Sequence, residues 1–337
     1  MESKIGWGDL MRTFIIRRVL SLIPLLLAVT FITQALLVAS PGNYVNILTT
    51  DPRLTPEFRQ LLIHKYHLES SNVFVRYWYW LWQALHGNFG HSFLYSTSVW
   101  SLVWQRLLNT LMLSVAALAI AWGLSIPLGV LAAVKHGTWL DRVIGFLSFL
   151  GLSMPVVFFS LSLVLLASAT QWFPTGGIHN EVFWDTFSVP QKLGDTLWHL
   201  ILPATVLGVV SMGQYVQQMR SEMIETLGKD YIRTAVAKGL RKRTIIFRHA
   251  VGNAINPLVS LFGFSLAYLL AGAVLTETVF SWPGMGRLTI DALSNKDEPL
   301  VMATVVLVTI MLALGSLASD VLLAIVDPRI RLEGRNV

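Results

Sequence analysis

The stretch Leu111-Met-Leu-Ser-Val-Ala-Ala-Leu-Ala-Ile-Ala-Trp-Gly-Leu-Ser-Ile-Pro-Leu-Gly-Val-Leu-Ala-Ala-Val134 decides the fold class, because its 24 residues include no charged side chain. A helix needs about 20 apolar residues to cross the ~30 Å hydrocarbon core of a membrane. A strand of a membrane barrel would instead alternate apolar and polar residues, and this stretch does not. It therefore predicts a membrane-spanning helix.

Five further stretches are long and apolar enough to cross a membrane: 14–37, 143–167, 200–217, 255–279 and 301–326. The whole chain of 337 residues is 54% hydrophobic and only 13% charged, about half the charge of a typical soluble domain. We therefore predict an all-α polytopic membrane protein with six spans. Prolines at positions 24, 127, 155 and 257 should kink or end their helices.

Basic residues set the predicted orientation, since Lys and Arg gather in the short cytoplasmic segments of membrane proteins. With the N-terminus inside, the segments 1–18, 135–142, 218–253 and 327–337 would be cytoplasmic, and they hold 17 of the 25 Lys and Arg residues. Both termini are therefore expected in the cytoplasm. The net charge of +6 then reflects topology and contact with the lipid bilayer, and we expect no nucleic-acid partner.

A long external loop, 41–107, is expected between the first two spans. Its aromatic cluster, Tyr77-Trp-Tyr-Trp-Leu-Trp82, suits a helix that lies at the bilayer interface, where amphipathic rings are favoured. The alternative is a surface that receives an extracytoplasmic partner.

The chain lacks the motifs of nucleotide, metal and nucleophilic chemistry: G-x-x-x-x-G-K-[ST], H-E-x-x-H, G-x-S-x-G and a metal-spaced pair of histidines. Cysteine is absent too, which excludes thiol chemistry. We therefore expect no catalytic residue, no bound metal and no enzymatic activity in this chain. Any energy from ATP must come through another chain.

Uncharged polar residues in and beside the spans are the candidates for lining a pathway: Asn109, Ser153, Gln214 and Ser265. Small and polar residues also serve helix–helix packing, which is the alternative for these four and the prediction for the glycines at 123, 129, 145, 151, 263 and 272. Glu277, near the outer end of the fifth span, is expected to be hydrated. A proton-coupled secondary transporter would need buried carboxylates and an inverted repeat, so it is the distant alternative.

A short polar segment, Asp230-Tyr-Ile-Arg-Thr-Ala-Val-Ala-Lys-Gly239, lies between the fourth and fifth spans. We predict a cytoplasmic helix near 221–239, capped by Ser221 or Thr226 and ended by Gly239 in the left-handed conformation.

This helix offers a surface on which a soluble partner can dock. Ala235 and Ala237 should keep that surface small enough for close contact. The alternative is that the basic run Arg241-Lys242-Arg243 only anchors a cytoplasmic loop.

A series of motifs runs through the chain: Arg17-Arg-Val-Leu-Ser-Leu-Ile-Pro-Leu-Leu-Leu-Ala-Val-Thr30 with Pro41-Gly42, Arg106-Leu-Leu-Asn-Thr-Leu111, Ile126-Pro-Leu-Gly-Val-Leu-Ala-Ala133, Pro174-Thr-Gly-Gly177, His199-Leu-Ile-Leu-Pro203 and Asp327-Pro-Arg-Ile-Arg331. In order and spacing they resemble the permease subunit of the dipeptide and oligopeptide class of ABC importers. The chain departs from this family at Asn43-Tyr44, where Asp-Pro is usual.

The resemblance implies a type I importer fold in the cell inner (plasma) membrane, with an N-terminal span and external loop at 1–105 and a five-helix core at 106–337. It implies half of a heterodimeric pathway, completed by a second permease, two ATPase subunits and an extracytoplasmic solute-binding protein. ATP and Mg would bind the ATPases, and this chain would hold no cofactor. The implied cargo is a di- or oligopeptide, with nickel chelates, glutathione, antimicrobial peptides and oligosaccharides as alternatives.

The resemblance also implies that the polar segment couples the chain to the ATPases. The general E-A-A motif of such permeases reads Arg233-Thr234-Ala235 here, and the glycine after it is Gly239. The peptide-permease variant of the motif matches from Asp230 to Leu240. The coupling residues implied are Asp230, Tyr231, Arg233, Thr234, Ala235, Ala237, Lys238 and Gly239.

Overall fold

A computed structural model describes residues 7–40, 55–57, 60, 64 and 72–326. Its regular structure is helical throughout these residues, apart from one isolated bridge between His91 and Ser98. The all-α prediction is therefore confirmed for this part of the chain. The motifs predicted at 41–44 and 327–331 lie outside the described residues.

The chain divides into two compact units. The first comprises residues 1–109 and 284–313, and the second comprises residues 110–283 and 314–337. The partition predicted at residue 105 from the resemblance stays a prediction.

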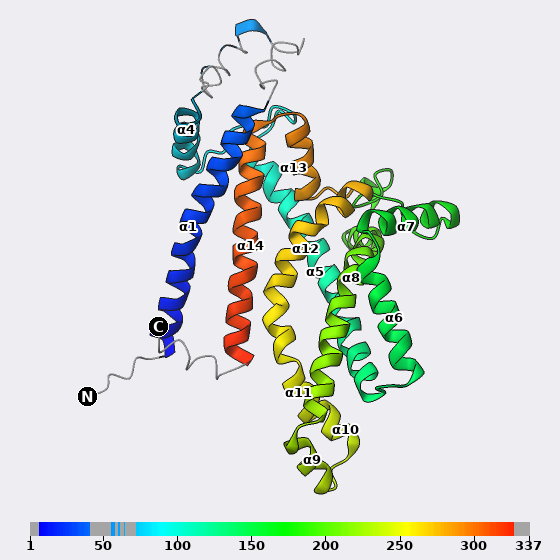
Figure 1. Ribbon diagram of the computed structural model, residues 1–337. Coiled ribbons are helices and arrows are strands. Elements are labelled where there is room, and N and C mark those ends of the chain that lie inside the picture. Colours follow the sequence, from blue (N-terminus) through cyan, green and yellow to red (C-terminus); the bar gives the residue numbers. More distant parts are fainter. Residues whose placement is uncertain (1–6, 41–54, 58–59, 61–63, 65–71, 327–337) are drawn as a thin grey trace, which may run out of the picture. The chain divides into compact units, whose positions relative to one another are not determined.

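The first unit contains α1 (Trp7–Ala39), α4 (Val73–Leu85) and α13 (Met285–Ser294), with the first part of α14 (Glu298–Val326) (Figure 1). Helix α4 is capped at its N-terminus by Asn72, whose side-chain oxygen accepts a hydrogen bond from the Phe74 amide over 3.0 Å. The predicted aromatic helix is thus present. Its exposed rings include Trp78 and Trp82, which are 65% and 58% exposed.

The second unit is built around α8 (Val189–Leu227), a helix of 39 residues. It also contains most of α5 (Val99–Val134), together with α6 (Trp139–Ser153), α7 (Val156–Thr170) and α12 (Asn256–Val279). A 3-10 turn, Trp184–Thr186, precedes α8. Between α8 and α12 lie α9 (Asp230–Ala237), α10 (Lys242–Thr244), the π-helix η2 (Ile245–Ala250) and α11 (Val251–Ala254).

Apolar helices long enough to cross a membrane occupy four of the six predicted positions, so the predicted number of six spans stays a prediction. Within the described residues, Leu20–Ala39, Val99–Val134, Val189–Leu227 and Glu298–Ala318 meet the requirements of length and composition. Helix α12 occupies the fifth predicted stretch, and its 24 residues extend about 36 Å at 1.5 Å per residue.

The third predicted span is wrong as a continuous helix. Stretch 143–167 is broken, and α6 and α7 meet at a bend of 100°. The reason is Pro155, which lacks an amide hydrogen and disfavours helical geometry in the residue before it. Met154 accordingly has the extended values φ −81° and ψ 122°. The sequence predicted a kink or an end at this proline, and the structure shows an end followed by a new helix.

Glycines bring the helices of the second unit into close contact. A Cβ atom at Gly129 would lie 2.6 Å from the Met219 Cβ, and one at Gly151 would lie 3.1 Å from the Val209 carbonyl oxygen. The packing prediction is therefore confirmed for these two glycines. At Gly123 an added Cβ would meet no atom of the described residues within 4 Å, so its packing role stays a prediction.

Candidate functional site

Helix α9, the first element of the polar segment, follows the end of α8 after two residues, Gly228 and Lys229. The predicted start near residue 221 is wrong, because α8 continues through Ser221 and Thr226 and ends at Leu227. Neither residue caps a helix, and Thr226 is buried inside α8. Lys229 instead precedes α9 in an extended conformation, φ −74° and ψ 150°.

Gly239 ends this segment as predicted, with a left-handed φ of +72°. The Gly239 amide donates to the Val236 carbonyl over 2.9 Å, and the Leu240 amide donates to the Ala235 carbonyl over 3.3 Å. These two bonds form a Schellman motif, which satisfies carbonyl groups at the end of a helix and reverses the chain. Glycine suits this position because a side chain disfavours positive φ.

The inner face of α9 packs into a hydrophobic cluster of the second unit. Ile232 and Ala235 are 4% and 7% exposed, and they lie three residues apart, so they share one face. The cluster also contains Val130 and Ala133 of α5, Met219 and Met223 of α8, Ile245 and Ala250 of η2, and Ala254 and Leu258 beyond it. Figure 1 shows α9 and α10 just beyond the end of α8.

The prediction that Ala235 belongs to the docking surface is therefore wrong. Its methyl group contacts the chain's own core, because the period of the helix turns it to the same side as Ile232. The outer face of α9 consists of exposed residues: Asp230, Tyr231, Arg233, Thr234, Val236, Ala237 and Lys238, with Gly239 after them. Val236 and Tyr231 are 60% and 42% exposed. Ala237 is thus exposed, as a docking residue must be.

Charged contacts on α9 lie at the surface. Arg233 Nη1 lies 3.3 Å from Asp230 Oδ1, and both side chains are mostly exposed, so the pair contributes little to stability. Lys229 Nζ lies 3.0 Å from Glu225 Oε1, and this hydrogen bond raises the pKa of Lys229. The side chains of α9 therefore stay available for an external partner.

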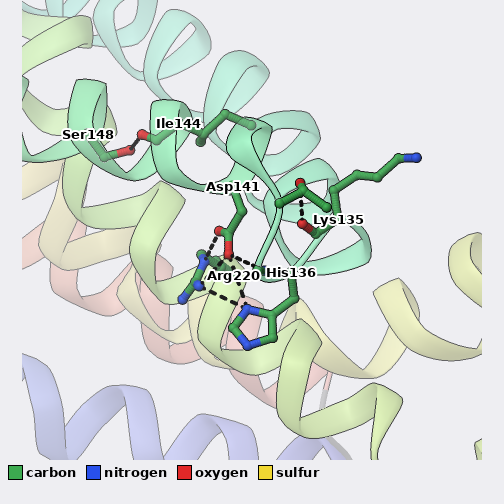
Figure 2. Close-up of polar contacts among 8 residues, drawn as sticks. Lys135, His136, Asp141, Ile144, Ser148 and Arg220 are labelled. Carbon is green, nitrogen blue, oxygen red and sulfur yellow. Dashed lines mark hydrogen bonds and ion pairs between the residues drawn. The ribbon is translucent and has the colours of Figure 1, made fainter.

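A second polar contact joins two helices of the second unit, where Asp141 of α6 meets Arg220 of α8 (Figure 2). Arg220 donates from Nε to Asp141 Oδ1 over 2.6 Å and from Nη2 to Oδ2 over 2.9 Å. The Gly137 amide donates to the same Oδ2 over 2.9 Å, and His136 Nδ1 lies 3.1 Å from it. Asp141 is 6% exposed, so this two-bond ion pair ties the short loop before α6 to α8.

Sequence reasoning missed this pair. Asp141 is the single acidic residue of the predicted basic loop 135–142, which is a visible but weak signal. Arg220 is 79 positions away, so no local pattern joins the two.

Replacing Asp141 with asparagine is expected to destabilise the second unit by about 2–3 kcal/mol, because it leaves Arg220 without its anion. The expected loss of stability is at or below the loss expected for a fully buried ion pair, because Arg220 is 26% exposed. Thermal unfolding of the purified chain in detergent would measure the loss. The matched control is Asp230→Asn, which breaks an exposed pair and should change stability by less than about 0.5 kcal/mol. Equal unfolding temperatures for the two variants would contradict the structural role of Asp141.

The structure places the four pathway candidates on four helices. Ser153 ends α6 at the bend and is exposed, and Gln214 of α8 is exposed as well. Asn109 of α5 is half-buried. Ser265 of α12 is 3% exposed, and its hydroxyl donates to the Leu261 carbonyl over 2.7 Å. The Ser265 hydroxyl is therefore buried and bonded within its own helix, and a pathway role for any of the four residues stays a prediction.

The expectation that Glu277 is hydrated is wrong. Its side chain is fully buried, and Oε1 accepts a hydrogen bond from the Thr110 hydroxyl over 2.5 Å. The sequence position near a helix end suggested contact with water, but α5 covers this carboxyl group.

Comparison with known proteins agrees with this architecture. Residues 125–332, which include α9, match the family described as binding-protein-dependent transport system inner membrane component. The chain is 38% identical over 322 residues to the oligopeptide transport system permease protein AppB of Bacillus subtilis strain 168, with 95% of this chain and 99% of that protein covered.

The dipeptide transport system permease protein DppB of Escherichia coli K12 is likewise 38% identical over 338 residues, with 95% and 99% covered. Among solved structures, an inward-facing form of the MetNI methionine ABC transporter aligns with a TM-score of 0.54 and 17% identity, over 67% of this chain and 96% of that chain. That likeness shows a shared fold.

Proposed function

Because the chain belongs to the family of binding-protein-dependent transport system inner membrane components, we propose that it is the permease subunit of an ATP-driven importer of di- or oligopeptides. It forms half of a heterodimeric translocation pathway in the cell inner membrane. A second permease, two ATPase subunits and an extracytoplasmic binding protein complete the importer. The relatives named for oligopeptide and dipeptide transport support the choice of substrate class.

The observation that carries the coupling proposal is the two-faced character of α9. Its inner face is fixed in the chain's own core by Ile232 and Ala235, while its outer face presents Tyr231, Thr234 and Ala237 to the surroundings. When a partner displaces a helix with this arrangement, the displacement is transmitted to the helices that pack against its inner face. In our proposal the ATPases cause this displacement of α9.

Force applied to α9 reaches the spans through packed contacts of the second unit. The cluster around Ile232 includes Met219 and Met223 of α8 and Val130 of α5. Packed interiors deform little, so these helices move with α9 rather than absorbing its displacement. The ion pair of Asp141 and Arg220 joins α6 to α8, so α6 moves with these helices. Closure of the ATPases on ATP would thereby change the arrangement of the pathway helices.

Transport should require all partners and ATP. Proteoliposomes with the chain, its second permease and the ATPases are expected to accumulate a labelled dipeptide only with ATP, Mg and the binding protein present. ATP should be bound and hydrolysed on the ATPase subunits, so the chain purified alone should show neither activity. Stoichiometric ATP binding by the isolated chain, or uptake driven by a proton gradient without ATP, would contradict the proposal.

Topology gives a further prediction, in which both termini and residues 218–253 lie in the cytoplasm. The chain has no cysteine, so single cysteines at Ser221 and Thr175, both exposed, can report sidedness. An impermeant thiol reagent added to spheroplasts should label Thr175→Cys and spare Ser221→Cys until the membrane is opened. Labelling of Ser221→Cys in sealed cells would reverse the assigned orientation.

A further inference from the structure

The second unit has an apolar groove that the transport proposal does not use, between the end of α5 and the helices η2 and α11. Its volume is about 460 Å³, within the range of ligand sites in proteins. Phe247 and Leu131 are 62% and 41% exposed, so the groove opens at the surface of the unit. Its lining is apolar throughout: Ile126, Pro127, Val130, Leu131, Val134, Ile246, Phe247 and Val251.

The π-helix η2 builds one wall of this groove. The Val251 amide donates to the Ile246 carbonyl, five residues earlier, whereas an α-helix bonds residues four apart. In an α-helix, side chains five residues apart point in directions about 140° apart. The wider turn of η2 instead places Ile246 and Val251 on the same wall. Such π turns are rare and occur frequently at functional sites.

Cations lie at the edges of the groove, and the segments that form it contain no acidic residue. Residues 126–136 and 241–254 include no Asp or Glu. Their five basic residues are all exposed: Lys135, Arg241, Lys242, Arg243 and Arg248. Lys135 directly follows Val134, and Arg248 directly follows Phe247, so a cation adjoins each wall.

The acidic residues that come closest in sequence already contact other cations. Asp141 binds Arg220 through two hydrogen bonds, and Asp230 lies 3.3 Å from Arg233. Figure 2 shows the Lys135 side chain extending away from Asp141. The positive charge along the groove is therefore available to an external anion.

A ligand of this site must combine a hydrocarbon portion with an anionic group. Water finds few hydrogen-bond partners between apolar walls, whereas a hydrocarbon chain fits them. The cations at the edges favour a negative charge beside that chain. Anionic phospholipids have this combination, and clusters of Lys and Arg next to the membrane attract them.

We propose that this groove binds an anionic phospholipid from the leaflet that faces the cytoplasm in the predicted topology. One acyl chain lies along Leu131 and Phe247, and the headgroup phosphate accepts hydrogen bonds from Lys135 and Arg248. Several groove residues also pack against the hydrophobic cluster beneath α9. The lipid would therefore stabilise the contact of α5 with η2, on which α9 rests.

Retention of lipid by the full chain tests this site. The chain is reconstituted in nanodiscs with equal amounts of phosphatidylglycerol and phosphatidylcholine, extracted into detergent and analysed by native mass spectrometry. We expect the wild type to retain phosphatidylglycerol in preference to phosphatidylcholine. Arg248→Gln should lower retention of phosphatidylglycerol about fivefold, the effect of removing one cation beside an anionic headgroup.

The matched control for this charge change is Arg142→Gln. Arg142 is an exposed cation of α6, whereas the described walls of the groove come from α5, η2 and α11. This variant should retain lipid like the wild type. Millimolar glycerophosphoglycerol, the headgroup without acyl chains, should not displace the lipid.

A second pair of variants tests the apolar part of the groove. Leu131→Trp should fill it and abolish retention. Leu124→Trp is the matched control, because Leu124 is 46% exposed and lies two turns before Leu131 on the same helix, outside the described walls. Equal unfolding temperatures of the two variants ensure that lost retention reflects the groove. If Leu131→Trp fails to fold, the comparison of Arg248→Gln with Arg142→Gln decides.

The assembled importer distinguishes a lipid from the second permease as the occupant. Leu131 is replaced with the photo-crosslinking residue p-benzoylphenylalanine, and irradiated membranes are analysed for crosslinked lipid and protein. We expect crosslinks to lipid. None of these measurements uses transport, so their failure would be distinguishable from a failure of the proposed importer function.

Four results would overturn the proposal. They are equal retention of the two lipids by the wild type, the same retention by Arg248→Gln as by Arg142→Gln, displacement of the lipid by glycerophosphoglycerol, and crosslinks to the second permease alone. The third would indicate a site for a free anion, and the fourth would show that a protein covers the groove.

Discussion

Replacing Gly239 with valine is expected to abolish substrate uptake while leaving membrane insertion and pairing with the second permease intact. Gly239 has a φ of +72°, and a Cβ added there would meet no atom within 4 Å. The effect must therefore arise from the backbone and not from a clash. A non-glycine residue in this conformation costs about 1–2 kcal/mol, which lowers the equilibrium constant for forming the native turn about five- to thirtyfold.

Asparagine at the same position is the matched control, because it tolerates the left-handed conformation at helix ends. Gly239→Asn should keep most of the uptake, while Gly239→Val should lose it, when both are assayed in proteoliposomes with the ATPases. The retained ATPase activity should no longer respond to the loaded binding protein in the valine variant. Equal uptake by the two variants would show that the Schellman end of α9 is not needed for coupling.

Replacing Ala237 with tryptophan should have an equally large effect on uptake for a different reason. Ala237 is exposed on the outer face of α9, so the bulky ring is tolerated by the chain's own fold. In the assembled importer the ring occupies the surface where we propose that the ATPase docks, and a packed interface does not absorb that volume. Uptake should fall below detection, with the unfolding temperature of the isolated chain unchanged.

Ala235→Trp gives the contrast within the same helix. Ala235 is 7% exposed and packs in the cluster with Ile232 and Met223. Overpacking such a site costs about 1–3 kcal/mol or more. This variant should therefore lose both uptake and stability, whereas Ala237→Trp should lose only uptake. A stable Ala235→Trp chain would contradict the inner face assigned to α9.

The sequence predicted the positions of four spans correctly, because a charge-free run such as 111–134 has few alternatives to a membrane helix. It predicted the left-handed Gly239 because a glycine directly after a short helical segment commonly ends the helix in this conformation. Pro155 gave the position of a break. The 100° bend at that break depends on how α6 and α7 pack against their neighbours, which no local pattern records.

The sequence analysis did not distinguish the buried face of α9 from its exposed face. Ala235 and Ala237 are equally small, and the idea of a docking surface treated them alike. Their different roles follow from packing against α8 and η2, although the three-residue spacing of Ile232 and Ala235 was a usable signal. Contacts between residues far apart in the sequence could not be predicted. Examples are the pair of Asp141 and Arg220 and the pair of Thr110 and Glu277.

The central claim is that the outer face of α9 holds the ATPases, and their retention by Ala237→Trp tests it most directly. The chain would be affinity-purified from membranes together with its partners, and the ATPase subunits recovered per chain would be quantified for the wild type, Ala237→Ser and Ala237→Trp. The account predicts full recovery with serine and loss of the ATPases with tryptophan, while the second permease is recovered equally in all three. Wild-type recovery of ATPases by Ala237→Trp, with uptake preserved, would contradict the account.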